Sequence, residues 1–368
     1  MSEYNWKKEK NCVRCESSAP VSEPDFQTRP VAKGRRKRIP LFLFLACLLA
    51  GALFWGFQAG KQKEKNPPPA IQPLPVDSAK ALAEAAEKYR HAIALVGLSA
   101  PEKNFFLPIG TAWAINKTQF VTNGHVVEGS KKSLMTLNKK CQTELLAEMF
   151  KEAGVKTEKE YIQKFGAAKY AGEKKRIADA AKKMCSAFTI ELRINGENLK
   201  SLPATHVQIH PEYIRTNFKC DLGIIHVAKE HDTFFNIAPE KTLHDLKSGE
   251  PVGSLGFPME NIPANNVNIQ NPIASMQTGI IVAVSDFALK DSGSKNNFFI
   301  RHNVPCSGGA SGSPLFNRKG MVVGVLNAIT TIPGTRVPSG SLINYGVRID
   351  VLSGIGPKTS VKEYLTIK

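Results

Sequence analysis

The chain has 368 residues, of which 42% are hydrophobic, and these values exclude both a disordered protein and a single small domain. Its formal charge is +17 at pH 7, which favours nucleic acid, an anionic membrane surface or an acidic substrate as a partner. The position of the charge along the chain decides between these partners.

The N-terminal region combines a basic block with an apolar run. Residues 33–38 read KGRRKR, and the 22 residues from Ile39 to Gly60 carry no charge. A helix of that length crosses about 30 Å of bilayer, and the basic block predicts residues 1–38 on the cytoplasmic side. We therefore expect a transmembrane signal anchor over 39–60. A cleaved signal peptide is the alternative, but its basic region is normally much shorter than these 38 residues.

The tail before the anchor contains an isolated Cys-x-x-Cys pair, Cys12 and Cys15. A structural zinc site needs four ligands, so these two cysteines would bind zinc only together with a second chain. Idle thiols are the simpler interpretation. The sequence predicts no metal and no organic cofactor.

After the anchor, the prolines of residues 61–76 predict an extended spacer. Asp77 and Ser78 then offer a cap for a helix that carries apolar residues at helical spacing up to Tyr89. From His91 onward short β-rich runs recur between turn residues, which is typical of an all-β barrel or sandwich. We expect one domain over 77–368, with strands in 91–98, 110–116, 119–127, 205–211, 222–228, 251–257, 278–285, 320–328 and 344–352.

A helical insertion at about residues 134–187 interrupts the β pattern. An apolar face ends at Gly154, Thr157 to Glu160 reads as a capping box, and a third helix follows before an alternating strand that starts at Phe188. Residues 131–186 contain 14 Lys or Arg against 7 Asp or Glu. This charge indicates a solvated helical face or, alternatively, a surface that contacts an anionic partner.

Four cysteines follow the anchor, in a compartment that can be oxidising, and all four are disulfide candidates. Cys141 and Cys185 stand at the two ends of the insertion. If they pair, the closed loop contributes about 4 kcal/mol in the chain-entropy model. Cys220 and Cys306 are the other two, and the sequence leaves their pairing open.

Three separate motifs provide the parts of a nucleophilic site. His125 lies in FVTNGHVV, Asp221 opens DLGIIHV, and Ser311 lies in GASGSP. Serine attacks a carbonyl only when a base accepts its proton, and the base in turn needs a carboxylate to orient it. Each motif alone is weak, because serine, histidine and aspartate also serve turns, cores and caps. Their joint occurrence in the order His, Asp, Ser predicts a catalytic triad, with an oxyanion hole made by the N–H groups of Gly309 and Ser311.

These motifs resemble those of the trypsin-like serine proteases with the chymotrypsin fold, most closely the HtrA/Deg and glutamyl endopeptidase branches. TNGHVV, DLGIIHV and GASGSPLFN carry the resemblance, which covers about residues 91–355 apart from the insertion. It implies two antiparallel β-barrels with the triad between them, and it implies that Asn327 supports Asp221. Ala310 departs from the family pattern, because relatives carry Asp or Asn there. We expect no PDZ domain after the protease domain.

The resemblance also bounds the specificity. Pro305 stands where relatives that cut after Arg or Lys carry an acid, and Leu326 stands where glutamyl endopeptidases carry a histidine. A small or aliphatic side chain at the cleaved position is therefore expected. The resemblance implies a substrate pocket lined by Leu326, Asn327, Ala328 and Gly346.

Together the patterns predict a membrane-anchored serine endopeptidase that acts on proteins or peptides in the periplasm or outside the cell. Two alternatives remain. The trypsin-like domain could be catalytically silent and bind protein partners, or the basic tail could be a module for nucleic acid or a membrane surface. Membrane topology alone explains the basic block, so nucleic acid is not expected as a partner.

Overall fold

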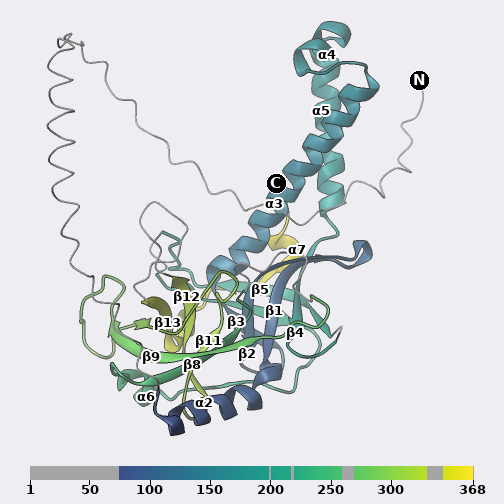
Figure 1. Cartoon of the computed structure of the whole chain (residues 1–368). Helices are drawn as coiled ribbons and strands as arrows, with labels where there is room; N and C mark the ends of the chain where they lie inside the picture. The colour runs from purple at the N-terminus through teal and green to yellow at the C-terminus, as the bar shows by residue number, and fades with distance from the viewer. Residues whose placement is uncertain (1–73, 199, 217–218, 259–268, 330–342, 368) are drawn as a thin grey trace, which may run out of the picture. The chain divides into compact units, whose positions relative to one another are not determined.

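Two antiparallel β-sheets close on themselves in this computed structural model, which describes residues 74–198, 200–216, 219–258, 269–329 and 343–367 (Figure 1). The first sheet has the order β5-β4-β1-β2-β3-β6, and the pairing of β5 with β6 closes a barrel. Its strands are β1 (Ile93–Ala100), β2 (Phe105–Ala114), β3 (Gln119–Thr122), β4 (Thr189–Ile194), β5 (Ser201–Ile209) and β6 (Gly223–Val227).

The second sheet has the order β11-β8-β9-β10-β13-β12, and the pairing of β11 with β12 closes it. Two short strands, β7 (Asn236–Ile237) and β14 (Thr359–Ser360), extend β12 and β5. The strands of the second barrel are β8 (Pro251–Gly256), β9 (Ser275–Ser285), β10 (Phe299–His302), β11 (Pro314–Asn317), β12 (Met321–Ile329) and β13 (Asn344–Arg348). The prediction of two antiparallel barrels is thus confirmed.

All nine predicted strand regions contain a strand, and the alternating run after Phe188 is β4. Strands β10 and β11 were not predicted, because each has only four residues and is too short to show an alternating pattern. The run 344–352 is a strand only as far as Arg348, since a 3₁₀ helix, η4 (Ile349–Gly354), follows it.

The predicted helix before β1 is α2 (Val76–Lys88), and it covers the second barrel. Leu82 is fully buried next to Gly253 of β8, and the Tyr89 ring stacks on Phe235 at 4.5 Å between centroids. The predicted side-chain cap is wrong. The helix begins on Pro75, whose carbonyl accepts the N–H of Ser78 at 2.9 Å, and Ser78 itself is buried.

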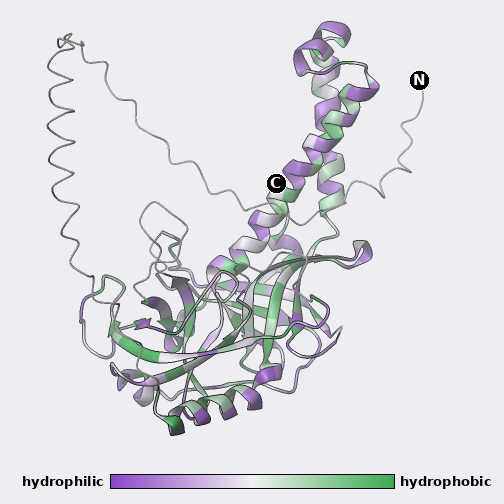
Figure 2. Cartoon of the chain, viewed as in Figure 1, coloured by the Kyte–Doolittle hydropathy of each residue, from purple (hydrophilic) through white to green (hydrophobic). Residues whose placement is uncertain are grey.

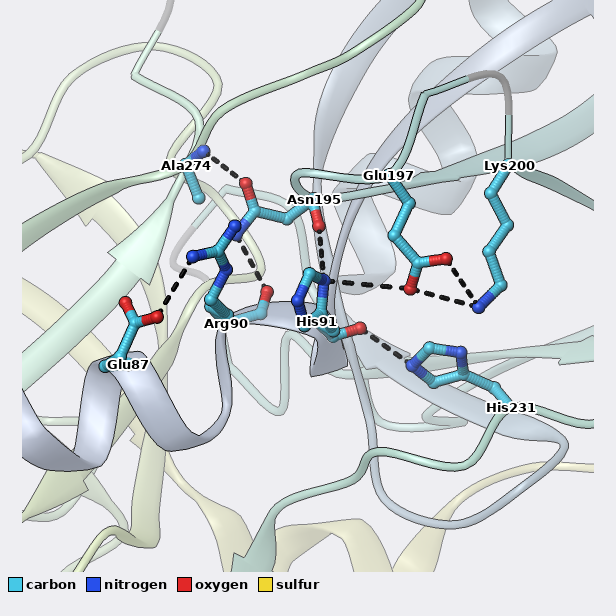
Figure 3. A network of polar contacts seen from close by, with 8 residues as sticks. All are labelled: Glu87, Arg90, His91, Asn195, Glu197, Lys200, His231 and Ala274. Atoms are coloured by element: carbon cyan, nitrogen blue, oxygen red, sulfur yellow. Dashed lines mark hydrogen bonds and ion pairs between the residues drawn. The ribbon is translucent and has the colours of Figure 1, made fainter.

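Asn195, directly after β4, connects three segments of the chain (Figure 3). Its side-chain amide donates to the Arg90 carbonyl at 2.8 Å, and its side-chain oxygen accepts the Ala274 N–H at 2.7 Å. The Asn195 carbonyl oxygen lies 3.0 Å from Nδ1 of His91. Because Ala274 directly precedes β9, this buried asparagine ties the first barrel to the second.

A helical arm interrupts the first barrel between β3 and β4. It consists of α3 (Gly124–Glu152), α4 (Glu158–Phe165) and α5 (Ala167–Cys185). The buried residues of α3 end at Cys141, and Figure 1 shows the distal half of α3 leading away from the barrels, with α4 at its end. Because α3 has 29 residues, it is about 43 Å long.

The insertion starts earlier than predicted. We expected it from about residue 134, with 119–127 as strand, but β3 ends at Thr122 and α3 begins at Gly124. Valine and glycine are poor helix formers, so the sequence of this segment favours a strand. Val126 and Val127 are buried against the first barrel, and this packing overrides their local preference.

The outer part of the arm has a small apolar core of its own. The Tyr161 ring lies 6.0 Å from that of Phe150 and 5.9 Å from that of Tyr170, and both tyrosines are buried. The predicted cap of α4 is confirmed, because Thr157 Oγ1 accepts the Glu160 N–H at 3.2 Å. Hydrophilic residues recur along the outside of the arm (Figure 2).

The basic tail 1–38, the predicted anchor 39–60 and residues 61–73 of the spacer lie outside the described residues. Within the described ranges, no helix combines the length and the apolar character needed to cross a bilayer.

A fully buried histidine in the second barrel makes the stability depend on pH. Burial lowers the pKa of His302 from 6.5 to about 4. Between these values the unfolded chain binds a proton that the folded chain does not, so the free energy of unfolding decreases as the pH falls through this window. When the pH falls from about 7.5 to about 5, we expect the free energy of unfolding of His302→Leu, measured with urea, to decrease less than that of the wild type.

His244→Gln, in the short helix α6 (Glu240–His244), is the matched control, since its ring is not fully buried. His302 is intact in this variant, so the fall in stability that His302 contributes should remain. Equal loss of stability in His302→Leu and the wild type would contradict this account of His302.

Candidate active site

The first turn of α3 places the backbone N–H and the ring of His125 against the Asp221 carboxylate. The His125 backbone N–H donates to Asp221 Oδ1 at 2.9 Å, and His125 Nδ1 lies 2.6 Å from Asp221 Oδ2. The Asp221 side chain is fully buried, whereas the His125 side chain is 21% exposed. The carboxylate therefore holds both the backbone and the ring of His125, and it favours the tautomer in which Nδ1 carries the proton.

Asn123 positions the aspartate from the other side. Its side-chain amide donates to the Asp221 carbonyl at 2.8 Å, and Asn123 is itself buried. Residues 123 and 125 thus bind both the backbone and the side chain of Asp221. The role of Asn123 was not predicted, although it stands inside the TNGHVV motif.

Two glycines allow α3 to lie close to the barrel. A Cβ atom at Gly110 of β2 would lie 2.8 Å from Val126 Cγ2, and one at Gly223 of β6 would lie 3.1 Å from Val127 Cγ2. Real Cβ atoms rarely approach other atoms so closely. The start of α3, and with it His125, therefore depends on the absence of side chains at these two positions.

Further along α3, Glu128 holds the segment that leads to Asp221. Glu128 Oε2 accepts from Arg215 at 2.6 Å and lies 3.5 Å from the Tyr213 hydroxyl, and Lys132 lies 3.1 Å from Oε1. Burial opposes ionisation of Glu128, but the hydrogen bonds from Arg215 and Lys132 outweigh it and lower the pKa of the carboxyl group. Burial, together with the nearby Asp221 and Glu128 carboxylates, raises the pKa of Tyr213. The tyrosine therefore stays a neutral donor.

The loop around Ser311 is bound to β2 through Thr111. The Thr111 N–H donates to the Ser311 carbonyl at 2.9 Å, and Thr111 Oγ1 donates to the Gly309 carbonyl at 2.8 Å. The same hydroxyl accepts the Phe257 N–H at 3.1 Å, and Phe257 directly follows β8. Thr111 of the first barrel thus fixes the loop that belongs to the second. Nothing in its local sequence indicates this role.

Glycine is required at two places in this loop. Gly309 and Gly312 adopt φ values of 92° and 90°, in the region that other residues rarely occupy. A side chain at Gly312 would also collide with the Thr111 carbonyl oxygen. The Gly-x-Ser-Gly pattern of the motif is therefore a backbone requirement as well as a sequence feature.

Two N–H groups of the loop are left available. The N–H groups of Ala310, Gly312 and Ser313 donate to backbone carbonyls at 3.1, 3.0 and 3.0 Å. No hydrogen bond within the described part of the chain uses the N–H of Gly309 or of Ser311. These are the two donors that the sequence analysis assigned to an oxyanion hole.

Ser311 lies close to the start of α3. A Cβ atom at Gly110 would lie within 3.2 Å of the Ser311 carbonyl and 2.8 Å of Val126, the residue after His125. The loop that carries Ser311 and the first turn of α3 therefore meet at the same point of β2.

The predicted pocket residues lie beside the loop on β12 and β13. The Leu326 carbonyl accepts the Gly312 N–H at 3.0 Å, and Leu326 pairs with Gly346 across the two strands. Leu326, Asn327 and Gly346 are buried, and Ala328 follows them on β12. Residues 330–342, which connect these strands, lie outside the described residues. The pocket lining therefore stays a prediction.

Among the described residues, no disulfide joins Cys220 to Cys306, and the pairing considered for Cys141 and Cys185 stays a prediction. The Cys306 thiol donates to the Val304 carbonyl at 3.2 Å, and burial raises its pKa to about 12. Cys220 is buried next to Asp221, and burial raises its pKa as well. Cys141 and Cys185 are buried on α3 and α5, which pack against each other.

Within the described residues, no group of His, Cys, Asp and Glu side chains is arranged to hold a metal ion.

Comparison with known proteins identifies the domain. The family model described as "Trypsin-like peptidase domain" matches residues 110–325, more than half of the chain's 368 residues. No curated protein matches the chain.

Solved structures of low sequence identity are also similar. An HtrA-type protease, AlgW, with a decapeptide is 14% identical at a TM-score of 0.44, over 73% of this chain and 64% of that one. Deg5 is 12% identical at a TM-score of 0.39, over 75% of this chain and 91% of that one. The chain thus spans less than two thirds of AlgW.

The close approach at Gly110 gives a direct test of the packing that seats His125. The Cβ atom of Gly110→Ala would press on both Val126 and the Ser311 carbonyl. We expect a loss of about 1–3 kcal/mol in the free energy of unfolding, measured with urea. Gly172→Ala on α5 is the matched control, because nothing lies within 4 Å of a Cβ atom there. It should gain up to about 1 kcal/mol through helix propensity. A Gly110→Ala protein as stable as the wild type would refute the packing argument.

Proposed function

The chain belongs to the trypsin-like peptidase domain family, and we propose that it is a membrane-anchored serine endopeptidase with His125, Asp221 and Ser311 as its catalytic groups. The observation that carries this proposal is the double contact of His125 with the buried Asp221 carboxylate, at 2.9 and 2.6 Å. Two unused backbone N–H groups in the Ser311 loop support it.

The proposed reaction follows from these positions. The Ser311 hydroxyl oxygen attacks the carbonyl carbon of the peptide bond, and His125 Nε2 accepts the hydroxyl proton. Asp221 keeps the proton of the ring on Nδ1 and stabilises the imidazolium that forms. When the C–N bond breaks, His125 gives its proton to the leaving amine, and an acyl-enzyme remains on Ser311. Water then attacks the acyl-enzyme by the same route and restores the serine.

The N–H groups of Gly309 and Ser311 are proposed to bind the oxygen of the tetrahedral intermediate. A backbone donor costs no reorganisation during the reaction, and the loss of one such donor slows comparable enzymes about 10²–10³-fold. The φ of 92° at Gly309 is a conformation that glycine adopts without strain. Thr111 holds this glycine by its carbonyl, and no hydrogen bond among the described residues uses its N–H.

Specificity for a small or aliphatic side chain at the cleaved position is part of the proposal. Its support is the position of Leu326 next to Gly312 and of Gly346 opposite Leu326. The proposed substrates are proteins or peptides.

The proposed location is the cytoplasmic membrane, with residues 1–38 in the cytoplasm and the peptidase domain in the periplasm or outside the cell. The support is the uncharged run from Ile39 to Gly60 and the basic block before it.

A catalytically silent domain that binds protein partners is the second candidate. One observation favours it. Ala310 stands where the relatives carry Asp or Asn. The Ala310 side chain is an apolar methyl group and is buried, so the loop has no polar side chain at this position.

Labelling with a fluorophosphonate separates the two candidates, because the reagent reacts with an activated serine. The full chain, solubilised in detergent, should be labelled at Ser311, as located by mass spectrometry. Ser311→Ala should abolish the label. Ser307→Ala should retain it, although Ser307 lies in the same loop and is partly exposed. A folded wild-type protein that takes no label would favour the silent domain.

A further inference from the structure

The arm carries much more positive than negative charge, and α5 concentrates it. Six basic side chains of α5 are exposed, against the two acidic residues Glu173 and Asp179. The six are Lys169, Lys174, Lys175, Arg176, Lys182 and Lys183. The proposed peptidase reaction uses none of them.

Five of these basic residues lie on one side of the helix. Lys169, Arg176 and Lys183 are seven residues apart, and so are Lys175 and Lys182. Seven residues make almost two full helical turns, so each set forms a row along the helix, about 21 Å long for the first set and about 10 Å for the second. The two rows lie about 110° apart around the helix axis, so together they occupy one broad side of the helix. We refer to these five residues as the basic stripe.

The basic stripe faces away from the rest of the protein. The buried residues of α5 are Tyr170, Ala181 and Cys185, and at about 100° per residue they lie on the opposite side of the helix. That side packs against α3. The stripe is therefore an unpartnered helix face.

Two acids lie in or beside the stripe. Asp179 is exposed and stands four residues from both Lys175 and Lys183, and Glu173 pairs with Arg176 at 3.1 Å. The five basic residues outnumber these two acids, so the face stays positively charged. Lys169 lies over the Phe165 ring at 4.6 Å. The ion pairs of the described residues include none with Lys175, Lys182 or Lys183. A solvated helix would usually be laced by pairs of opposite charge, so this stripe has the character of a binding face.

We propose that the basic stripe binds the anionic headgroups of the membrane that holds the proposed anchor. Charge complementarity supports this partner, since a row of exposed cations matches a plane of anionic headgroups. The inference rests on the proposed anchor, because the anchor keeps the stripe within reach of the bilayer.

Such contact would also orient the active site. The helix α3 is continuous from Gly124 to Glu152, and α5 packs along it. A stripe fixed on the membrane would therefore fix the direction in which the site around His125 faces. Substrates at the membrane surface would then approach from a restricted set of directions.

The test places the full chain in lipid nanodiscs of phosphatidylcholine alone, or of phosphatidylcholine mixed with phosphatidylglycerol. Exposed lysines are acetylated briefly, and the modified positions are read by mass spectrometry. We expect the reactivity of Lys175, Lys182 and Lys183 to fall severalfold in the anionic discs and to recover at high salt. Lys247 and Lys319, which are exposed on the peptidase domain, should react equally in both discs.

Charge reversal gives a matched pair of variants. Lys175→Glu, Lys182→Glu and Lys183→Glu together should abolish the effect of anionic lipid on the remaining lysines of the arm. The control variant replaces the exposed Lys229, Lys247 and Lys319 of the peptidase domain by glutamate. It should retain the effect of anionic lipid on the reactivity of the arm lysines. Both variants change the net charge equally, and urea unfolding checks that both are folded.

The outcomes separate the anchor from the arm. A full chain that leaves the neutral discs at high salt would refute the anchor, and the inference would fall with it. A chain that stays in both discs, with equal lysine reactivity in the two, would overturn the inference alone. Protection of the stripe by an added acidic protein or nucleic acid, with none by anionic lipid, would also overturn it.

Discussion

The contact between Asp221 and the start of α3 is the interaction on which the rest of the site depends. One buried carboxylate accepts the His125 N–H and also meets the His125 ring, while Asn123 binds the Asp221 carbonyl. A buried charge is stable only when its oxygens are satisfied, so this aspartate requires α3 to begin where it does. The same turn is the first turn of the arm, and the position of the arm follows from that of His125.

A second constraint is the closeness of backbones where the two barrels meet. Gly110 lets α3 and the Ser311 loop approach the same point of β2, and Thr111 then binds that loop by its N–H and its hydroxyl. On another side, Asn195 ties β4 to the segment before β9. The relative position of the barrels is thus fixed by buried polar groups. Such groups are costly to separate, because each would lose its hydrogen bonds away from water.

The two ends of the helical arm are stabilised in different ways. Its base is buried against the first barrel through Val126 and Val127, whereas its outer part is stabilised by a small aromatic core around Tyr161. This division lets the outside of α5 carry a high density of positive charge without disturbing the barrel. The proposed membrane contact would therefore orient the peptidase domain without changing the contacts between His125 and Asp221.

The sequence by itself determined most of the strands, the three helices of the arm, the α4 cap at Thr157 and the order of the three motifs, because strand and helix periods and capping are local properties. The arrangement in two barrels was implied by the resemblance of the motifs to a known family. Only the tertiary structure decided that α3 begins at Gly124, since burial of two valines overrides their weak helix propensity. It also decided the roles of Asn123 and Thr111. Their partners lie 98 and 198 residues away in the chain, and no local pattern records a contact over such a distance.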